Sequence, residues 1–231
     1  RLSLEGGGAS ESLGKQLSWW FTKISIKIGG EVMQIERKWA MPGVAGGKEM
    51  IPFPRKKYNI IYADPPWPYN ESGSNAKVKN RHYPMMQLDE ICSLPVRNLQ
   101  AEKCILFLWV TAPRLPMAFE VIRAWGFIYH SLGFDWLKVS SAGNPIINPG
   151  YYTRQNNEFC LIGVPPEKER RIKPLVHDVR APIITERREH SRKPDEVREA
   201  IVRICGDLPR IELFARQKHE GWDVWGNEFY F

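Results

Sequence analysis

The sequence predicts an α/β fold with a doubly wound, mostly parallel sheet, on the basis of two observations. Apolar runs of strand length recur at residues 58–63, 104–111, 158–164 and 210–215. Amphipathic helical patterns, each opened by a proline and closed by a glycine, lie at residues 113–126 and 194–206. Strands that alternate with helices favour a parallel sheet with helices on both faces.

Residues 1–50 are predicted to be an N-terminal extension and residues 51–231 the main domain. The first fifteen residues are rich in Gly and Ser and are expected to be disordered. Isoleucines at 24, 26 and 28 alternate with polar residues before Gly29-Gly30, which predicts a hairpin. This hairpin is interpreted as a peripheral ribbon or linker, with a partner or nucleic-acid surface as the alternative. Whether residues 1–32 are native stays open, because Met33 is another candidate start.

The stretch from Tyr58 to Trp67 organises the main domain. Its apolar strand stops at Asp64-Pro65-Pro66-Trp67, where two prolines cannot donate to a sheet ladder. A carboxylate, a rigid backbone and an indole ring are therefore expected just past the carboxyl end of a strand, where open α/β sheets bind ligands.

These residue types suit a flat base with an exocyclic amine. The 6-amino group of adenine is a poor nucleophile because its lone pair is delocalised into the ring. Two acceptors, the Asp64 carboxylate and the Pro65 carbonyl, would favour the tetrahedral amine, in which the lone pair is available. Trp67, together with Tyr69, offers a stacking surface for the base.

The next segment, residues 68–84, is polar and turn-prone. A long loop after a catalytic strand is interpreted as a lid over the bound base, with an ordinary exposed loop as the alternative. Lys77, Lys79 and Arg81 are candidates for phosphate contact.

Further elements follow in order. A short helix is predicted at residues 88–93 and a strand at 127–139, and Trp109, Trp125 and Trp136 are expected in the core. Residues 140–154, rich in Gly, Asn and Pro, are a candidate region for target recognition. The basic stretch 165–190, which includes Arg171 and Arg188, is interpreted as an irregular insertion that contacts phosphates. A solvated charged loop is the competing interpretation.

Composition narrows the class of protein. The net charge of +7 favours a polyanionic partner but does not by itself identify one. The four cysteines show no Cys-x-x-Cys spacing and the five histidines are scattered, so we expect a reducing intracellular compartment and no metal. The location would be cytoplasmic, or nuclear in a eukaryote. The longest apolar run, 104–110, is too short to span a membrane.

Four sequence blocks carry a family resemblance. Asp64-Pro65-Pro66-Trp67 is followed in order by segments 104–111, 191–196 (Ser-Arg-Lys-Pro-Asp-Glu) and 212–228. Together they resemble the MT-A70-like family, which contains the messenger-RNA adenosine methyltransferases and their bacterial and phage DNA relatives. The resemblance covers roughly residues 55–230 and implies a Rossmann-like methyltransferase fold in which the catalytic block precedes the cofactor block.

The resemblance also implies residue roles. Asp64, Pro65, Pro66 and Trp67 match the catalytic motif, and Tyr83 matches a position near the substrate adenine. Asp64 and the matching residues Lys193, Arg216, Asn227 and Glu228 imply a site for S-adenosylmethionine, in which Lys193 either meets the donor's carboxylate or orients Asp64. Two features depart from expectation: Gln217-Lys218-His219 replaces a histidine-asparagine pair of some members, and no Gly-x-Gly-x-x-Gly loop occurs.

The predicted function is methyl transfer from S-adenosylmethionine to the 6-amino group of adenine in nucleic acid. The remaining substrate contacts are assigned to Tyr69, Arg81, Arg171 and Arg188. DNA is preferred because no zinc finger or other appended RNA-binding module is found, and RNA is the close alternative. A catalytically silent nucleic-acid-binding partner subunit is the third possibility, and either a homo-oligomer or a hetero-oligomer is compatible with the sequence.

Overall fold

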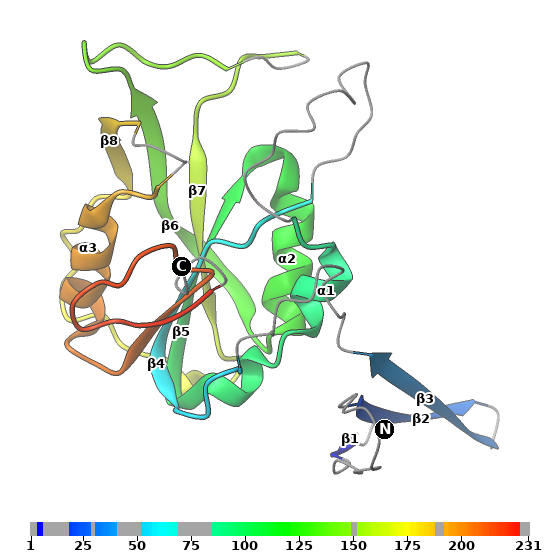
Figure 1. The fold of residues 1–231 in the computed structure, drawn as a ribbon. Helices are drawn as coiled ribbons and strands as arrows, with labels where there is room; N and C mark the ends of the chain where they lie inside the picture. The colour runs from blue at the N-terminus through cyan, green and yellow to red at the C-terminus, as the bar shows by residue number, and fades with distance from the viewer. Residues whose placement is uncertain are drawn as a thin grey trace. The chain divides into compact units, whose positions relative to one another are not determined.

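The structure is a computed structural model that divides into two compact units, Arg1–Met50 and Ile51–Phe231 (Figure 1). It describes the backbone of residues 4–6, 19–28 and 31–40 in the first unit. In the second unit it describes residues 52–68, 85–148, 152–187 and 192–226. None of the helices in these ranges is long and apolar enough to cross a bilayer.

The first unit contains a three-stranded antiparallel sheet. Its strands are β1 (Leu4–Gly6), β2 (Trp19–Ile28) and β3 (Glu31–Ala40), in the order β1-β2-β3. β2 and β3 pair from Trp19–Ala40 to Ile28–Glu31, where the isoleucine alternation predicts a hairpin. Of the fifteen residues expected to be disordered, Leu4–Gly6 form β1 and the others lie outside the described residues.

The second unit is built on a seven-stranded sheet with the order β10-β9-β4-β5-β7-β6-β8. Its strands are β4 (Tyr58–Ala63), β5 (Gln100–Thr111), β6 (Ile128–Val139), β7 (Glu158–Val164), β8 (Pro182–Glu186), β9 (Arg210–Leu213) and β10 (Asp223–Trp225). Every neighbouring pair is parallel except the two that involve β7, which runs against β5 and β6. The predicted doubly wound, mostly parallel α/β sheet is confirmed.

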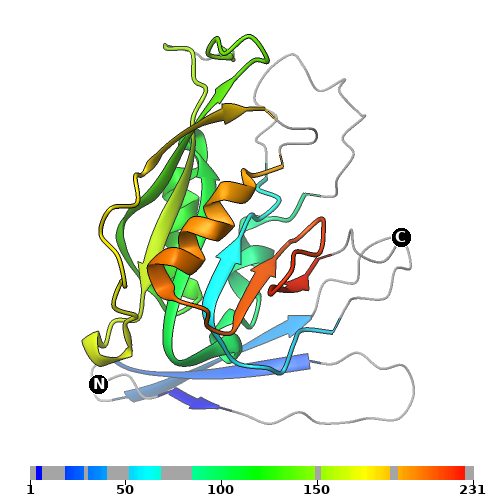
Figure 2. The ribbon, with the colours of Figure 1, turned by 90° about the vertical axis from the view of Figure 1, so that its left-hand side faces the viewer.

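Helices cover both faces of this sheet. α1 (Leu88–Ser93) and α2 (Leu115–Ala124) lie on one face, and α3 (Asp195–Cys205) lies on the other, where it crosses in front of the strands in Figure 2. Three short 3₁₀ turns complete the unit: η1 (Val96–Leu99), η2 (Ala112–Arg114) and η3 (Lys168–Arg170).

The central strands are apolar on both sides because each side packs against helices. Along β5, Leu106, Leu108 and Val110 join the core beneath α1 and α2, whereas Phe107 and Trp109 join the core beneath α3. All five side chains are at most 1% exposed. This continuous burial produces the uninterrupted apolar run that predicted the strand.

The carboxyl edge of the parallel strands positions the motif that follows β4. The Pro66 carbonyl accepts a hydrogen bond from the Met86 N–H at 3.1 Å. The Pro68 carbonyl accepts one from Arg114 Nε, at the start of α2, at 2.7 Å. The residues on either side of segment 69–84 are thus attached to the carboxyl edge. Residues 69–84 of the predicted lid lie outside the described residues.

Candidate active site

Asp64 stands directly after β4, and its carboxylate is partly open to solvent. Its side chain is 26% exposed, in contrast to the fully buried Ala63 before it. The two prolines that follow have no N–H groups, so the chain leaves the sheet here. The Pro65 carbonyl accepts a hydrogen bond from the Trp67 N–H at 2.8 Å, which leaves its second lone pair available.

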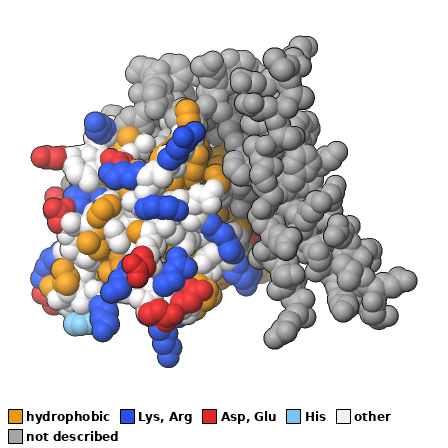
Figure 3. All heavy atoms as spheres, turned by 90° about the horizontal axis from the view of Figure 1, so that it is seen from below, with side chains coloured by type: hydrophobic (Ala, Val, Ile, Leu, Met, Phe, Trp, Pro, Cys, Tyr) orange, Lys and Arg blue, Asp and Glu red, His pale blue; other side chains and the backbone are white. Residues whose placement is uncertain are grey.

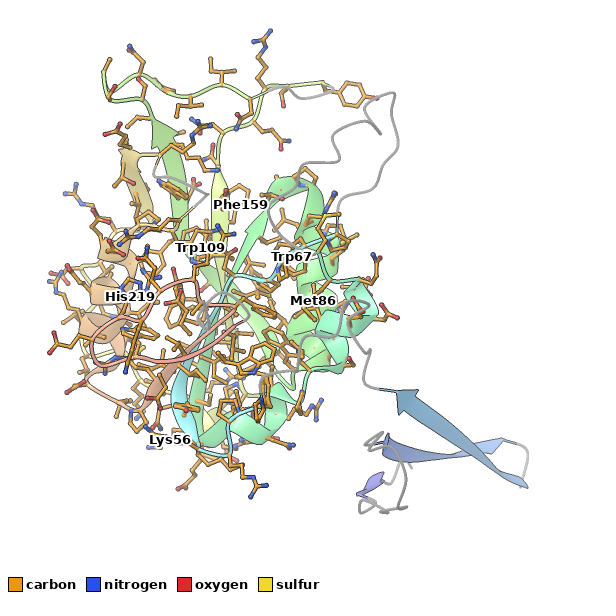
Figure 4. The ribbon with its side chains drawn as sticks, viewed as in Figure 1. Lys56, Trp67, Met86, Trp109, Phe159 and His219 are labelled. Atoms are coloured by element: carbon orange, nitrogen blue, oxygen red, sulfur yellow. The ribbon has the colours of Figure 1, made fainter. Side chains whose placement is uncertain are left out.

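Trp67 is held by the strand next to β4. Its indole N–H donates to the Trp109 carbonyl at 3.0 Å, and its side chain is buried, with 8% of the residue exposed. Trp109 in turn donates from its own indole N–H to the Tyr62 hydroxyl at 2.7 Å. Figure 4 labels both tryptophans, which stand at neighbouring positions near this edge. Trp67 is therefore fixed by packing and hydrogen bonding, and its stacking role stays a prediction.

Lys193 joins Asp64 to a second carboxylate. Its ammonium donates to Asp64 Oδ2 at 2.5 Å and lies 3.0 Å from Glu158 Oε2. Its side chain is only 6% exposed. Lys193 lies just before α3, which packs against the sheet. Burial would lower the pKa of Lys193, but the two carboxylates outweigh burial and raise that pKa, so the side chain is a cation.

Glu158 and Lys138 extend this ion pair inward. Glu158 begins β7, and because β7 is antiparallel its first residue lies at the carboxyl edge of the other strands. Its second oxygen, Oε1, accepts a short hydrogen bond from Lys138 Nζ, near the end of β6. Burial would raise the pKa of Glu158, but Lys193 and Lys138 together lower it to about 2.

The four groups form a chain of alternating charge, which we call the ion chain: Asp64, Lys193, Glu158 and Lys138. Two carboxylates balance two ammonium groups, as buried charges require. Aromatic rings line the buried cations, with Lys193 Nζ 5.5 Å from the Trp109 ring centroid and Lys138 Nζ 5.0 Å from that of Trp136. Asp64 is the exposed end, with Oδ2 bound to lysine and Oδ1 directed to no other described residue.

A second buried pair fixes α3 against the sheet. Arg198 binds Glu212 of β9 through two parallel hydrogen bonds of 2.8 and 2.7 Å. It also binds Asp195 at 3.0 Å and lies 5.4 Å from the Tyr62 ring centroid. Such bidentate geometry sets the position of the helix, and with it the position of Lys193 just before the helix begins.

The backbone of Gly226 crosses closely over the chain just after β9. Phe214, directly after β9, has a positive φ of 61°, and Arg216 follows two residues later. A Cβ added to Gly226 would meet the Ala215 carbonyl oxygen at 2.6 Å and its nitrogen at 2.9 Å. Only glycine lets the chain cross there, and Asn227 follows it directly in the sequence.

His219 belongs to a different part of the surface. It lines a cavity of about 490 Å³ between α3 and the segment 219–222, together with Asp195, Arg198 and Trp222. Burial and the nearby Arg198 lower its pKa, so it favours the neutral form. Neither Asp64 nor Lys193 lines this cavity, and His219 is labelled in Figure 4 on the α3 side.

The structure brings together some of the predicted site residues. Asp64 and Lys193 meet at the carboxyl edge. Pro65 and Trp67 follow Asp64 in the chain, and Arg216 follows the end of the neighbouring strand β9 by three residues. Six predicted residues lie outside the described residues: Tyr69, Arg81, Tyr83, Arg188, Asn227 and Glu228. Glu158 and Lys138 were not predicted; the only signal was a charged residue at the first position of an apolar strand.

Arg171 lies at the opposite edge of the sheet. It forms a bridge with Cys104 near the start of β5, and its guanidinium donates to the Pro165 and Pro166 carbonyls at 3.0 Å each. Seen from that edge, Figure 3 shows Lys and Arg side chains interspersed with acidic ones. The structure does not bring Arg171 to the Asp64 site.

Comparison with known proteins identifies the family of this chain. The family model described as MT-A70 matches residues 58–228. Type II methyltransferase M.MunI from Mycoplasma sp is 35% identical over 202 residues, which cover 78% of this chain and 82% of that protein. The putative N(6)-adenosine-methyltransferase MT-A70-like of Medicago truncatula is 33% identical over 74% of this chain, but only 26% of its own length.

The human relative shows the same partial coverage. The N(6)-adenosine-methyltransferase catalytic subunit METTL3 of Homo sapiens is 29% identical over 74% of this chain and 28% of its own length. The chain thus spans most of M.MunI and about a quarter of the N(6)-adenosine-methyltransferases. The predicted resemblance is confirmed, and this chain belongs to the MT-A70 family.

Proposed function

We propose that this chain transfers a methyl group from S-adenosylmethionine to the 6-amino group of adenine in DNA. One observation carries the proposal: Asp64 is oriented through Oδ2 by the buried Lys193, while Oδ1 and the free lone pair of the Pro65 carbonyl remain available. Two fixed acceptors beside each other match the two hydrogens of an exocyclic amine.

The acceptors act on the amine by holding its hydrogens. Hydrogen bonds to Asp64 Oδ1 and to the Pro65 carbonyl favour the tetrahedral nitrogen, whose lone pair can attack. S-Adenosylmethionine supplies an electrophilic methyl group on a sulfonium. As the new N–C bond forms and the S–C bond breaks, the nitrogen must lose one proton, and Asp64 Oδ1 is the acceptor in reach. The products are N6-methyladenine and the demethylated thioether.

Lys193 serves this reaction by orienting Asp64. Two roles are open to Lys193: binding the donor's carboxylate or orienting Asp64. The second is favoured, since its ammonium lies between Asp64 and Glu158 within the ion chain. Arg216, Asn227, Glu228 and the Gly226 crossing are proposed to hold the methyl donor, and binding there sets up the in-line geometry from which most of the rate gain comes.

The choice of DNA over RNA rests on how much of each relative's length this chain covers. The chain spans 82% of the type II methyltransferase and about a quarter of the N(6)-adenosine-methyltransferases, whose names support the RNA alternative. A silent partner subunit is disfavoured because such a subunit has no need of an oriented, solvent-facing carboxylate. Nucleic acid is the proposed partner; the oligomeric state and the intracellular location stay predictions.

Labelled methyl transfer tests the proposal. Matched single- and double-stranded DNA and RNA are incubated with labelled S-adenosylmethionine and either wild type or Asp64→Ala. We expect label in adenine of DNA with wild type and none with the variant. Label in RNA alone would select the alternative substrate, and label on cytosine would refute the base assignment. Calorimetry of donor binding separates an enzyme from a silent subunit, which should bind no S-adenosylmethionine.

A further inference from the structure

The connection between β6 and β7 projects from the edge that carries Asp64. We call residues 140–148 and 152–157 the β6–β7 arm; residues 149–151 lie outside the described residues. β6 runs toward the carboxyl edge and β7 returns from it, so the arm must leave the sheet there, as Figure 1 shows above both strands. Its outer limbs meet at the antiparallel bridge between Asn148 and Gln155.

The arm is rich in neutral hydrogen-bonding groups and has no acidic residue. No aspartate or glutamate occurs from Ser140 to Asn157, although the whole chain has 26. Asn144, Asn148 and Gln155 are exposed, and their carboxamides bind no other described residue. Carboxamides carry a donor and an acceptor side by side, which is the pattern that reads base edges in the major groove.

Two large apolar side chains of the arm face solvent. Tyr152 is 93% exposed and Ile147 is 60% exposed. Single exposed apolar residues are common, but an exposed ring next to amide groups on a projecting arm suits stacking on a base. Two exposed arginines accompany the arm. Arg154 lies within it, and the backbone N–H of Arg187 donates to the Val139 carbonyl at its base at 3.0 Å.

The base of the arm is fixed to the ion chain. The Asn156 carboxamide donates to the Lys138 carbonyl at 2.7 Å and accepts from the Lys138 N–H at 3.2 Å. The Nζ of the same Lys138 binds Glu158, which shares Lys193 with Asp64. The base of the arm is therefore held in a defined position relative to the carboxylate that is proposed to bind the target amine.

We propose that the β6–β7 arm is the element that reads the nucleic acid around the target adenine. The carboxamides of Asn144, Asn148 and Gln155 contact edges of the flanking bases. Tyr152 stacks on a base beside the extruded adenine, and Arg154 and Arg187 contact phosphates. The inference rests on the proposed methyltransferase function and adds to it the residues that select the site.

Sequence selection is tested with randomised DNA. Duplex DNA with random sequence is methylated by wild type, by Asn148→Ala/Gln155→Ala and by the control Leu175→Ala, and methylated adenines are sequenced with their neighbours. Leu175 is 67% exposed and outside the arm. We expect the arm variant to relax the preference at one or more flanking positions, and the control to retain it.

The stacking role of Tyr152 is tested by relieving the cost of base extrusion. On the preferred duplex, Tyr152→Ala should raise the KM for DNA about tenfold, the scale of one lost base–aromatic stack. On the same duplex with an abasic site opposite the target adenine, the increase should shrink, because extrusion is then easier. Unchanged S-adenosylmethionine binding by each variant verifies that it is folded.

The outcomes separate the two proposals. If wild type methylates no adenine, the proposed function fails and the arm inference fails with it. If wild type is active but both arm variants match Leu175→Ala in KM and in flanking preference, the arm inference alone is overturned.

Discussion

Lys193 Nζ donates to Asp64 Oδ2 at 2.5 Å, although 129 residues separate the two in the chain. The contact exists because β4 and the start of α3 reach the same edge of the sheet. It joins the motif after β4 to the block that opens α3, and it leaves the other oxygen of Asp64 for a substrate. Substitution of either Lys193 or Asp64 tests the importance of this contact.

Removing the ammonium group should affect activity and stability together. Lys193→Met leaves Asp64 and the buried Glu158 without their shared cation, so we expect unfolding free energy to fall by about 3–5 kcal/mol. The rate of methyl transfer should fall about a hundredfold, because Asp64 loses its orientation. Urea unfolding and steady-state kinetics measure the two effects.

Lys56→Met is the matched control for Lys193→Met. Lys56 pairs with Asp223 at 2.8 Å at the opposite end of the sheet, with 59% of its side chain exposed. It is labelled in Figure 4 at that end. Loss of this pair should cost about 0–1 kcal/mol and leave methyl transfer unchanged. Equal effects of the two variants would contradict the role of Lys193.

Acid should destabilise the fold through Glu158. Its pKa falls from the usual 4.5 to about 2 in the folded state, so the unfolded state binds a proton more readily. The stabilisation is complete above pH 4.5 and is lost as pH falls toward 2. Unfolding free energies measured across this range should decline more steeply for wild type than for Glu158→Gln. Parallel curves would show that Glu158 is not stabilised as a carboxylate.

Gly226 should be required for binding of the methyl donor. An added methyl group meets the Ala215 backbone, which cannot move as a flexible side chain can, so Gly226→Ala should shift the chain at the end of β9. We expect the affinity for S-adenosylmethionine to fall about tenfold, or 1.4 kcal/mol, by calorimetry. Gly206→Ala is the control: its φ of +90° also strains an alanine, but it lies after α3 at the other edge. Similar donor affinities in both variants would count against the proposed site.

The sequence predicted the central strands because they are buried on both faces. β4, β5 and β7 contain long apolar runs, and such runs identify a strand without knowledge of its neighbours. β8 (Pro182–Glu186) was missed and interpreted as irregular insertion, because it is a short edge strand with an exposed Ile184. β10 (Asp223–Trp225) has only three residues, and its pairing with β9 defines it.

The antiparallel direction of β7 explains why the sequence did not predict Glu158 at the site and why Arg171 lies away from it. A sequence run does not indicate whether its strand is parallel or antiparallel to its neighbours. Since β7 is reversed, Glu158 at its start reaches the carboxyl edge beside Asp64, and Arg171, which follows its end, lies at the opposite edge. Asp64 and Lys193 were found through their motifs, whereas Glu158 and Lys138 depend on pairing between distant strands.

The central claim is that Asp64 makes the adenine amine reactive. The most direct measurement is single-turnover methyl transfer to DNA at saturating S-adenosylmethionine, with the product nucleosides identified by mass spectrometry. Asp64→Asn keeps the size of the side chain but removes its charge, so wild type should form N6-methyladenine and the variant should form it at least about a hundredfold more slowly, with donor binding retained. N6-methyladenine formed at the same rate by both proteins would contradict the account.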